Sequence, residues 1–348
     1  PKYAHKYGSI PTHAPEQWVL MDVDDLTAHV EFLVRVVEEG IHSGRDSAIG
    51  SRGSSRGASR TPATPNDGVQ MLGFALAYLY AACATSDVAN VVANSPLFTS
   101  LSSCIRGKYV TEAHRSTAAS VIGLILRQAT LIQDGVDISA MASALSDTCR
   151  EQFRNVRLKR RLVAALGETL FYIASQAASA AGQLPEHWRV PDTALTILRR
   201  CVQDEDKITC HYAVKTIENV TSISGGHAHA FATNEIGLLL WTAFAHSSDS
   251  SVRRSCAWGI SRICQITPSI LQHVADKAGL AAVVATLRDP STRVKQPIVN
   301  AMLLAFLTGP SLSRLVTGLT DNANLMENIM SILDVRQQPH VFVVERER

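Results

Sequence analysis

A helical pattern returns five times along this chain at nearly constant spacing. Within each copy, apolar residues recur at offsets close to 4, 8, 11 and 12, which lie on one face of a helix. The Leu158 copy, for example, predicts that Leu166 is buried, whereas Thr216 makes the Ile208 copy the weakest. The copies start at Ala113, Leu158, Ile208, Val252 and Val294, in steps of 45, 50, 44 and 42 residues.

A period of about 40–47 residues is typical of armadillo and HEAT repeats. The predicted fold class is all-α, an armadillo/HEAT-type α-solenoid superhelix, and periodicity alone does not separate the two repeat types. Each repeat of a solenoid packs only on its neighbours, so the fold makes a long surface and seldom a catalytic pocket. The sequence therefore favours a binding scaffold over an enzyme.

The domain organisation follows from where this pattern is present and where it stops. Residues 1–16 have no period and are predicted to be an irregular lead-in, and residues 17–336 to form about six to seven repeats. A segment rich in Ser, Arg and Gly, residues 43–67, interrupts the first repeat. It has too little apolar surface to offset its ordering entropy, so we expect disorder there and a flexible tail over 337–348.

Composition narrows the classes of partner. The formal net charge of +2 gives no global attraction to nucleic acid or to an anionic membrane. The 7 cysteines include no Cys-x-x-Cys pair and fit buried thiols in a reducing compartment. No signal peptide and no long apolar run is present, and Pro1 in place of Met suggests a piece of a longer protein. We therefore expect a cytoplasmic protein with protein partners, no nucleic acid and no membrane.

No catalytic signature is present. The chain lacks H-E-x-x-H, G-x-S-x-G and a phosphate-binding loop between a strand and a helix. His227 and His229 lie close together but have no cysteine or carboxylate at a useful spacing to complete a metal site. We expect no catalytic residue, no cofactor and no metal, and therefore no enzyme activity in this chain.

Basic residues recur at the starts of the aligned helices, where each opposes the helix dipole by roughly 0.3–1 kcal/mol. One explanation is structural, because Asp249 and Asp289 each precede an arginine by four residues. A capping aspartate could then pair with a basic residue of its own or the adjacent repeat. The other explanation is a basic strip along one edge of the solenoid that meets an acidic partner. The candidate partner-binding residues are Arg157, Lys159, Arg160, Arg161, Arg253, Arg254, Arg293 and Lys295.

One stretch is more particular than a generic repeat. Between Arg160 and Gln176, it carries Leu166-Gly-Glu168 followed by Leu170-Phe-Tyr-Ile-Ala174. It resembles the C-terminal armadillo/HEAT repeat region of the Fused/Runkel-like Unc-51-like (pseudo)kinase family. The resemblance implies an N-terminal kinase-like domain, often a pseudokinase, before the repeats. This chain has no kinase motif, so the resemblance transfers no catalytic or nucleotide-binding residue.

The resemblance also implies a role. We expect a scaffold associated with microtubules, cilia or flagella, located in the cytoplasm and on the cytoskeleton. The partner implied is a Fused-type kinase or a microtubule-associated protein. The alternative is a generic armadillo adaptor for cargo or signalling, similar to karyopherins and catenins, which would favour regularly spaced Asn and Trp. Asn219 and Asn300 lie on aligned helices, but Trp258 lies on another, so the sequence predicts no regular ladder.

Overall fold

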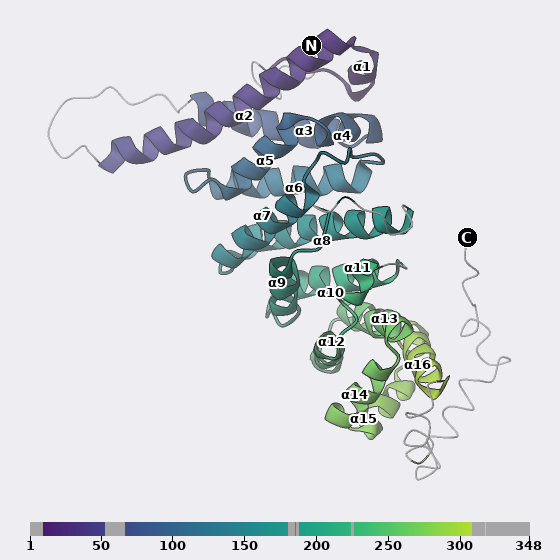
Figure 1. Cartoon of the computed structure of the whole chain (residues 1–348). Coiled ribbons are helices and arrows are strands. Elements are labelled where there is room, and N and C mark those ends of the chain that lie inside the picture. The colour runs from purple at the N-terminus through teal and green to yellow at the C-terminus, as the bar shows by residue number, and fades with distance from the viewer. Residues whose placement is uncertain are drawn as a thin grey trace. The chain divides into compact units, whose positions relative to one another are not determined.

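The computed structural model describes residues 10–52, 67–179, 185, 188–223, 226–307 and 317. Every regular element in these ranges is a helix, which confirms the all-α prediction (Figure 1). The chain divides into two compact units, each described by itself. Unit 1 comprises Pro1–Ile173 with Leu184–Ile197, and unit 2 comprises Ala174–Gln183 with Leu198–Arg348.

Unit 1 holds the helices drawn in purple to teal in Figure 1. The long helix α2 packs against α3 and α5, α3 packs against α6, and α5 packs against α6 and α7. These helices are α1 (Pro15–Leu20), α2 (Val23–Arg52), α3 (Asp67–Ala82), α4 (Ser86–Ala93), α5 (Pro96–Arg106), α6 (Glu112–Gln128), α7 (Ile138–Glu151) and the larger part of α8 (Val156–Ser179). At Gly123 a Cβ atom would lie 3.2 Å from the Cα of Ala165, so this glycine lets α6 and α8 approach closely.

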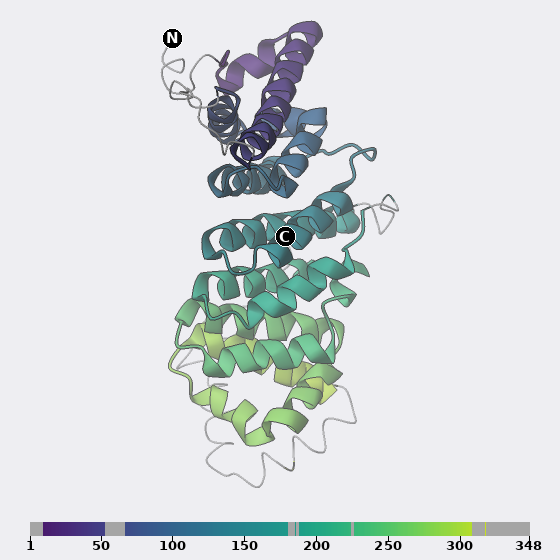
Figure 2. The same ribbon diagram turned by 90° about the vertical axis from the view of Figure 1, so that its left-hand side faces the viewer.

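Unit 2 repeats one pairing of helices (Figure 2). Helix α10 packs against α13, α13 packs against α16, and α12 covers α13 and α14. Helices α10, α13 and α16 begin at residues 207, 250 and 292, which preserves the predicted repeat. The elements are the end of α9 (Asp192–Val202), α10 (Lys207–Thr221), α11 (Gly226–His229), α12 (Asn234–His246), α13 (Ser250–Ile266), α14 (Ser269–Ala278), α15 (Leu280–Ala285), η1 (Thr286–Arg288) and α16 (Thr292–Leu307).

The recurring apolar face forms the core. Leu166 is fully buried, and so are Cys256, Ile260 and Ile263 of the Val252 copy. Thr216, the polar residue of the Ile208 copy, is also buried. Its hydroxyl donates a hydrogen bond to the carbonyl of Tyr212, at 2.8 Å, so the buried polar group has a partner. The predicted helix phase is correct at Thr216. It is wrong at Ile208 and Tyr212, which were expected on the same inward face and are 43% and 37% exposed, because the first turns of this helix bury Thr209 and Ala213, one residue later.

Side-chain caps fix where several of the helices start. The carboxylate of Asp206 accepts a hydrogen bond from the backbone N–H of Thr209 at 2.9 Å, and that of Asp249 accepts from Ser251 and Val252. Thr111 and Thr233 cap α6 and α12 in the same way. Such a cap satisfies backbone donors that the helix cannot pair internally.

The boundaries differ from the predicted domains at two places. Pro15 and Glu16, placed in the lead-in, already belong to α1. Helix α2 continues to Arg52, ten residues into the segment 43–67. No proline interrupts the sequence between Val23 and Arg52, so nothing forces the helix to stop earlier. Residues 53–66, a helix expected near 325–333 and the tail 337–348 lie outside the described residues.

An aromatic cluster holds the start of unit 1. The hydroxyl of Tyr78 accepts hydrogen bonds from the indole N–H of Trp18 and the backbone N–H of His13, both at 2.9 Å, and donates to the carbonyl of His13. The ring of His29 lies 3.3 Å from the same hydroxyl and is buried. Burial, and then the nearby His13, lower the pKa of His29 from 6.5 to about 4.

This shift predicts a loss of stability in mild acid. Between pH 6.5 and pH 4 the unfolded chain binds a proton at His29 and the folded chain does not, so stability falls as the pH falls through this range. We expect the loss from His29 to reach roughly 1–3 kcal/mol. Urea denaturation at a series of pH values should show a smaller loss in the His29→Gln variant. Identical pH profiles for the two proteins would contradict the assignment.

A second prediction concerns Leu166. Leu166→Ala should lower the free energy of unfolding by about 2–5 kcal/mol, since it removes fully buried methyl groups and leaves a cavity. Urea denaturation followed by circular dichroism measures the change. Arg161→Ala on the exposed side of the same helix is the matched control, and it should change stability by about 0.5 kcal/mol or less. A loss below about 1 kcal/mol for Leu166→Ala would mean that the helix phase is wrong.

Candidate protein-binding surface

The fourth residue of the aligned helices explains much of the basic pattern. On α6, Arg115 donates from Nε to the carbonyl of Ile105 in the last turn of α5, at 2.8 Å. On α10, the thiol of Cys210 donates to the carbonyl of Val202 at the end of α9, at 3.2 Å. This position therefore contacts the carboxyl end of the preceding helix, where a positive charge is favourable.

Two of the predicted partner-binding residues occupy the same fourth position. The ammonium of Lys159 lies 4.4 Å from the centre of the Phe153 ring, which follows α7, and the guanidinium of Arg253 lies 4.8 Å from the ring of Phe244 in the last turn of α12. Lys159 is only 4% exposed. Lys159 was expected in an exposed strip, and this expectation is wrong because its helix position directs it onto the neighbouring helix end.

Arg253 also connects adjacent repeats. Its guanidinium pairs with the carboxylate of Asp289, which lies in the turn before α16 and accepts a hydrogen bond from the N–H of Ser291 at 2.8 Å. Asp249 instead caps its own helix, and hydrogen bonds from the backbone N–H groups of Val252 and Ser251 lower its pKa. The predicted ladder is therefore confirmed for the adjacent repeat at Arg253, whereas Asp249 binds backbone groups.

The remaining predicted residues are more open to solvent. Arg157 and Arg161 in unit 1 are exposed, and Arg160 is half-buried. In unit 2, Arg293 is exposed, and Arg254 and Lys295 are half-buried. Lys295 is also a fourth residue, that of α16, so the fourth position packs on the preceding helix end at Arg115, Lys159 and Arg253, and the exposed predicted cations are Arg157, Arg161 and Arg293.

Unit 2 also has a surface that the sequence analysis did not identify. The fifth, ninth and thirteenth residues of α10, α13 and α16 are spaced one helical turn apart, so they lie along one face of each helix. All of them are half-buried, and we name them the unit 2 array. The array consists of His211, Lys215 and Asn219 on α10, Arg254, Trp258 and Arg262 on α13, and Gln296, Asn300 and Leu304 on α16.

The array contains cations and amides but no carboxylate. Helices α13 and α16 have no Asp or Glu at all, and the single one in α10, Glu218, pairs with Lys215 at 2.8 Å. The guanidinium of Arg262 lies 5.5 Å from the centre of the Trp258 ring. The sequence contained a signal for this array, because its members are the fifth, ninth and thirteenth residues counted from the start of each helix. It was missed because Asn and Trp were sought at equivalent positions of every helix.

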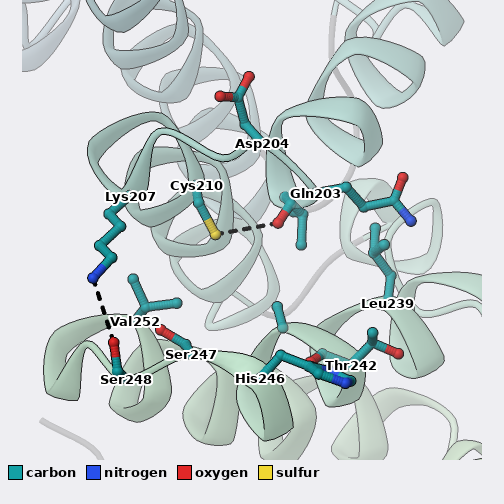
Figure 3. A pocket seen from close by; sticks show the side chains of 12 residues that line it. Gln203, Asp204, Lys207, Cys210, Leu239, Thr242, His246, Ser247, Ser248 and Val252 are labelled. Atoms are coloured by element: carbon teal, nitrogen blue, oxygen red, sulfur yellow. Dashed lines mark hydrogen bonds between the residues drawn. The ribbon is translucent and has the colours of Figure 1, made fainter.

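A pocket of about 350 Å³ lies between the α9–α10 and α12–α13 turns (Figure 3). Its apolar wall includes Leu239 and Val252, and the ammonium of Lys207 reaches the hydroxyl of Ser248 across the repeats, at 3.3 Å. Burial raises the pKa of the Cys210 thiol in its wall to about 11, so this thiol is protonated at neutral pH and a poor nucleophile. The volume of the pocket is large enough for a side chain.

Over the residues that the structure describes, no three His, Cys, Asp or Glu side chains gather in a way that could hold a metal ion. In the same residues, no single helix is both long and apolar enough to cross a membrane, although Ser269–Ala278 and Leu280–Arg288, bent by 105°, reach those limits as a pair.

The fold is that of an armadillo-type α-solenoid. A designed armadillo repeat protein in complex with the peptide (KR)4 is similar in structure, with a TM-score of 0.52 and 15% sequence identity over 78% of this chain and 99% of the designed chain. No protein-family model matches the chain.

Two kinases are similar to the chain in sequence. The serine/threonine-protein kinase ULK4 of Mus musculus is 30% identical over 269 residues, which is 76% of this chain. The serine/threonine-protein kinase RUNKEL of Arabidopsis thaliana is 29% identical over 272 residues, or 74% of this chain. The chain spans 20% of the length of each relative. These matches confirm the predicted resemblance to the repeat region of the Fused/Runkel-like kinases.

The pair between Arg253 and Asp289 can be tested by a double-mutant cycle. Arg253→Ala and Asp289→Asn should show a coupling free energy of about 1 kcal/mol in urea denaturation, because the Asp289 side chain is only 9% exposed. The asparagine keeps an oxygen to accept the Ser291 N–H.

The control pair is Arg150 with Asp147, whose side chains are 63% and 39% exposed. Its coupling should be about 0.5 kcal/mol or less. If the Arg253–Asp289 coupling is no larger than that of the control, the pair does not join the repeats.

Proposed function

We propose that this chain is a non-enzymatic scaffold, the helical-repeat region of a Fused/Runkel-like microtubule- or cilium-associated kinase or pseudokinase that docks a partner protein. The relatives and the armadillo-type fold support this assignment. The observation that carries it is the division of the basic residues on α8. There Lys159 packs against the neighbouring helix end, whereas Arg157 and Arg161 are exposed.

Arg157 and Arg161 are four residues apart and so lie on the same face of α8. Like charges at this spacing destabilise a helix by about 0.2–0.5 kcal/mol, and their place near its amino end adds to the cost. An acidic partner would remove both costs. The arrangement therefore favours binding of an acidic protein surface over a role in stability.

The class of partner is proposed from the resemblance to the Fused/Runkel-like kinases. A Fused-type kinase or a microtubule-associated protein is the proposed partner, and the proposed location is the cytoplasm, on the cytoskeleton and in cilia or flagella. Any kinase activity would reside in the part of such proteins outside this chain. The scaffold would then place that domain beside its partner.

A pull-down from cytoplasmic extract tests this proposal. Wild-type protein should retain a specific partner at low salt, and the double variant Arg157→Glu with Arg161→Glu should lose most of it. Salt should weaken the association, since the Debye length is about 10 Å at 0.1 M. The control Arg106→Glu with Lys108→Glu changes the charge of exposed residues of unit 1 by the same amount and should retain the partner. Equal capture by all three proteins would reject the role of α8.

Lys159→Glu provides a contrasting variant. Because Lys159 is buried over an aromatic ring, the new carboxylate would lose solvation without a cation to pair with. We expect a loss of several kcal/mol of stability, seen as a lower urea midpoint. If the Lys159→Glu protein were as stable as the wild type and failed to retain the partner in the pull-down, this lysine would act in binding.

A further inference from the structure

We propose that the unit 2 array binds an extended acidic peptide segment that carries an apolar side chain. The inference deepens the proposed function, on which it rests, by assigning a partner chemistry to a surface other than α8.

The spacing fits an extended chain. Helices α10, α13 and α16 pack side by side, and packed helices lie about 8–10 Å apart. An extended peptide advances about 3.3 Å per residue, so about three of its residues cover one helix-to-helix step. A peptide of about six to nine residues that crosses the three helices would meet one row of array side chains after another.

The side chains suit the backbone of such a peptide. Asn219, Gln296 and Asn300 each present an amide with both donors and an acceptor, which matches the N–H and C=O groups of an extended strand. Two polar atoms on α10, Nδ1 of His211 and Oε2 of Glu218, are buried with no hydrogen-bond partner among the described residues. Such atoms are uncommon in folded proteins, and because both are buried, a bound backbone would pair with them only after their side chains turn toward the surface.

The positive charge of the array favours a peptide that carries acidic residues. Glu218 balances the charge of Lys215, so Arg254 and Arg262 give the array its net positive charge, and none of its members is a carboxylate. Arginine forms two parallel hydrogen bonds to a carboxylate and favours it strongly over a neutral group. The designed armadillo relative is in complex with the basic peptide (KR)4. A peptide of that charge would be repelled by this array.

Trp258 adds a site for one apolar side chain. Its ring is half-buried at the middle position of the middle helix and lies beneath the Arg262 guanidinium. A flat ring between two arginines in the same row can pack against an aromatic side chain while the guanidinium groups hold flanking carboxylates.

Fluorescence anisotropy with two labelled octapeptides tests the proposal on the full chain. One peptide is a run of glutamates with a central phenylalanine, and the other is (KR)4. We expect the acidic peptide to bind at low salt and the basic peptide not to bind. Binding of (KR)4 in preference to the acidic peptide would overturn the proposal.

Charge-reversal variants locate the site. Arg254→Glu with Arg262→Glu should weaken binding of the acidic peptide at least tenfold, and the neutral pair Arg254→Gln with Arg262→Gln should weaken it less. Lys277→Glu with Arg288→Glu, at exposed positions of unit 2 outside the array, is the matched control and should bind as the wild type does. Circular dichroism confirms that each variant folds. An equal loss in the control would mean that the whole unit attracts the peptide and the array is not the site.

The aromatic contact is tested separately. Trp258→Ala should weaken binding of the phenylalanine peptide more than binding of a matched peptide that has alanine at its centre. Equal weakening of both would exclude the contact.

The two proposals can fail independently. If the array variants bind the acidic peptide normally while the α8 variants lose the cellular partner, the array is wrong and the scaffold function stands. If the peptide binds as expected but no cellular partner is recovered, the array stands and the scaffold proposal fails.

Discussion

The packing of the aligned helices α6, α8, α10 and α13 on the end of the preceding helix is the contact on which the rest of the structure depends. The apolar face buries residues such as Leu166 and Ile260 completely. The fourth residue then ties each of these helices to the preceding one, by Arg115 at the carbonyl of Ile105 and by Cys210 at that of Val202. These contacts are short in sequence and recur with the repeat, so each repeat is completed mainly by its neighbours.

This packing also determines which side chains remain for binding. Once the apolar face and the fourth position are used, the fifth, ninth and thirteenth residues of a helix point away from its core. In unit 2 these positions hold cations, amides and Trp258. In unit 1 a different pair of positions is exposed on α8, the second and sixth, which hold Arg157 and Arg161. A fold of this kind can change its partner by substitution at those positions without altering its core.

The sequence could predict the helices and their buried faces because the apolar period depends only on local geometry. It could not decide what the cations at the helix starts do, because Lys159 and Arg161 differ by half a turn and only the neighbouring helix distinguishes them. Arg253 shows the same limit, since its partner Asp289 lies 36 residues away in the next repeat. The sequence pattern did not reveal the unit 2 array because its members differ in residue type and share only their position in the helix. The end of α2 at Arg52 was misplaced because composition signals disorder without marking where a helix stops.

Covalent footprinting of aromatic side chains in the presence of a purified partner tests most directly the claim that the outward face of the aligned helices is the binding surface. The residues to follow are Trp258 of the unit 2 array and Tyr212, the exposed neighbour of His211 in that array, with Tyr80 and Tyr109, which are 49% and 47% exposed, as references elsewhere. We predict that the partner protects Trp258 and Tyr212 from modification and leaves Tyr80 and Tyr109 reactive. Protection of Tyr80 or Tyr109 with unchanged labelling of Trp258 would contradict the account.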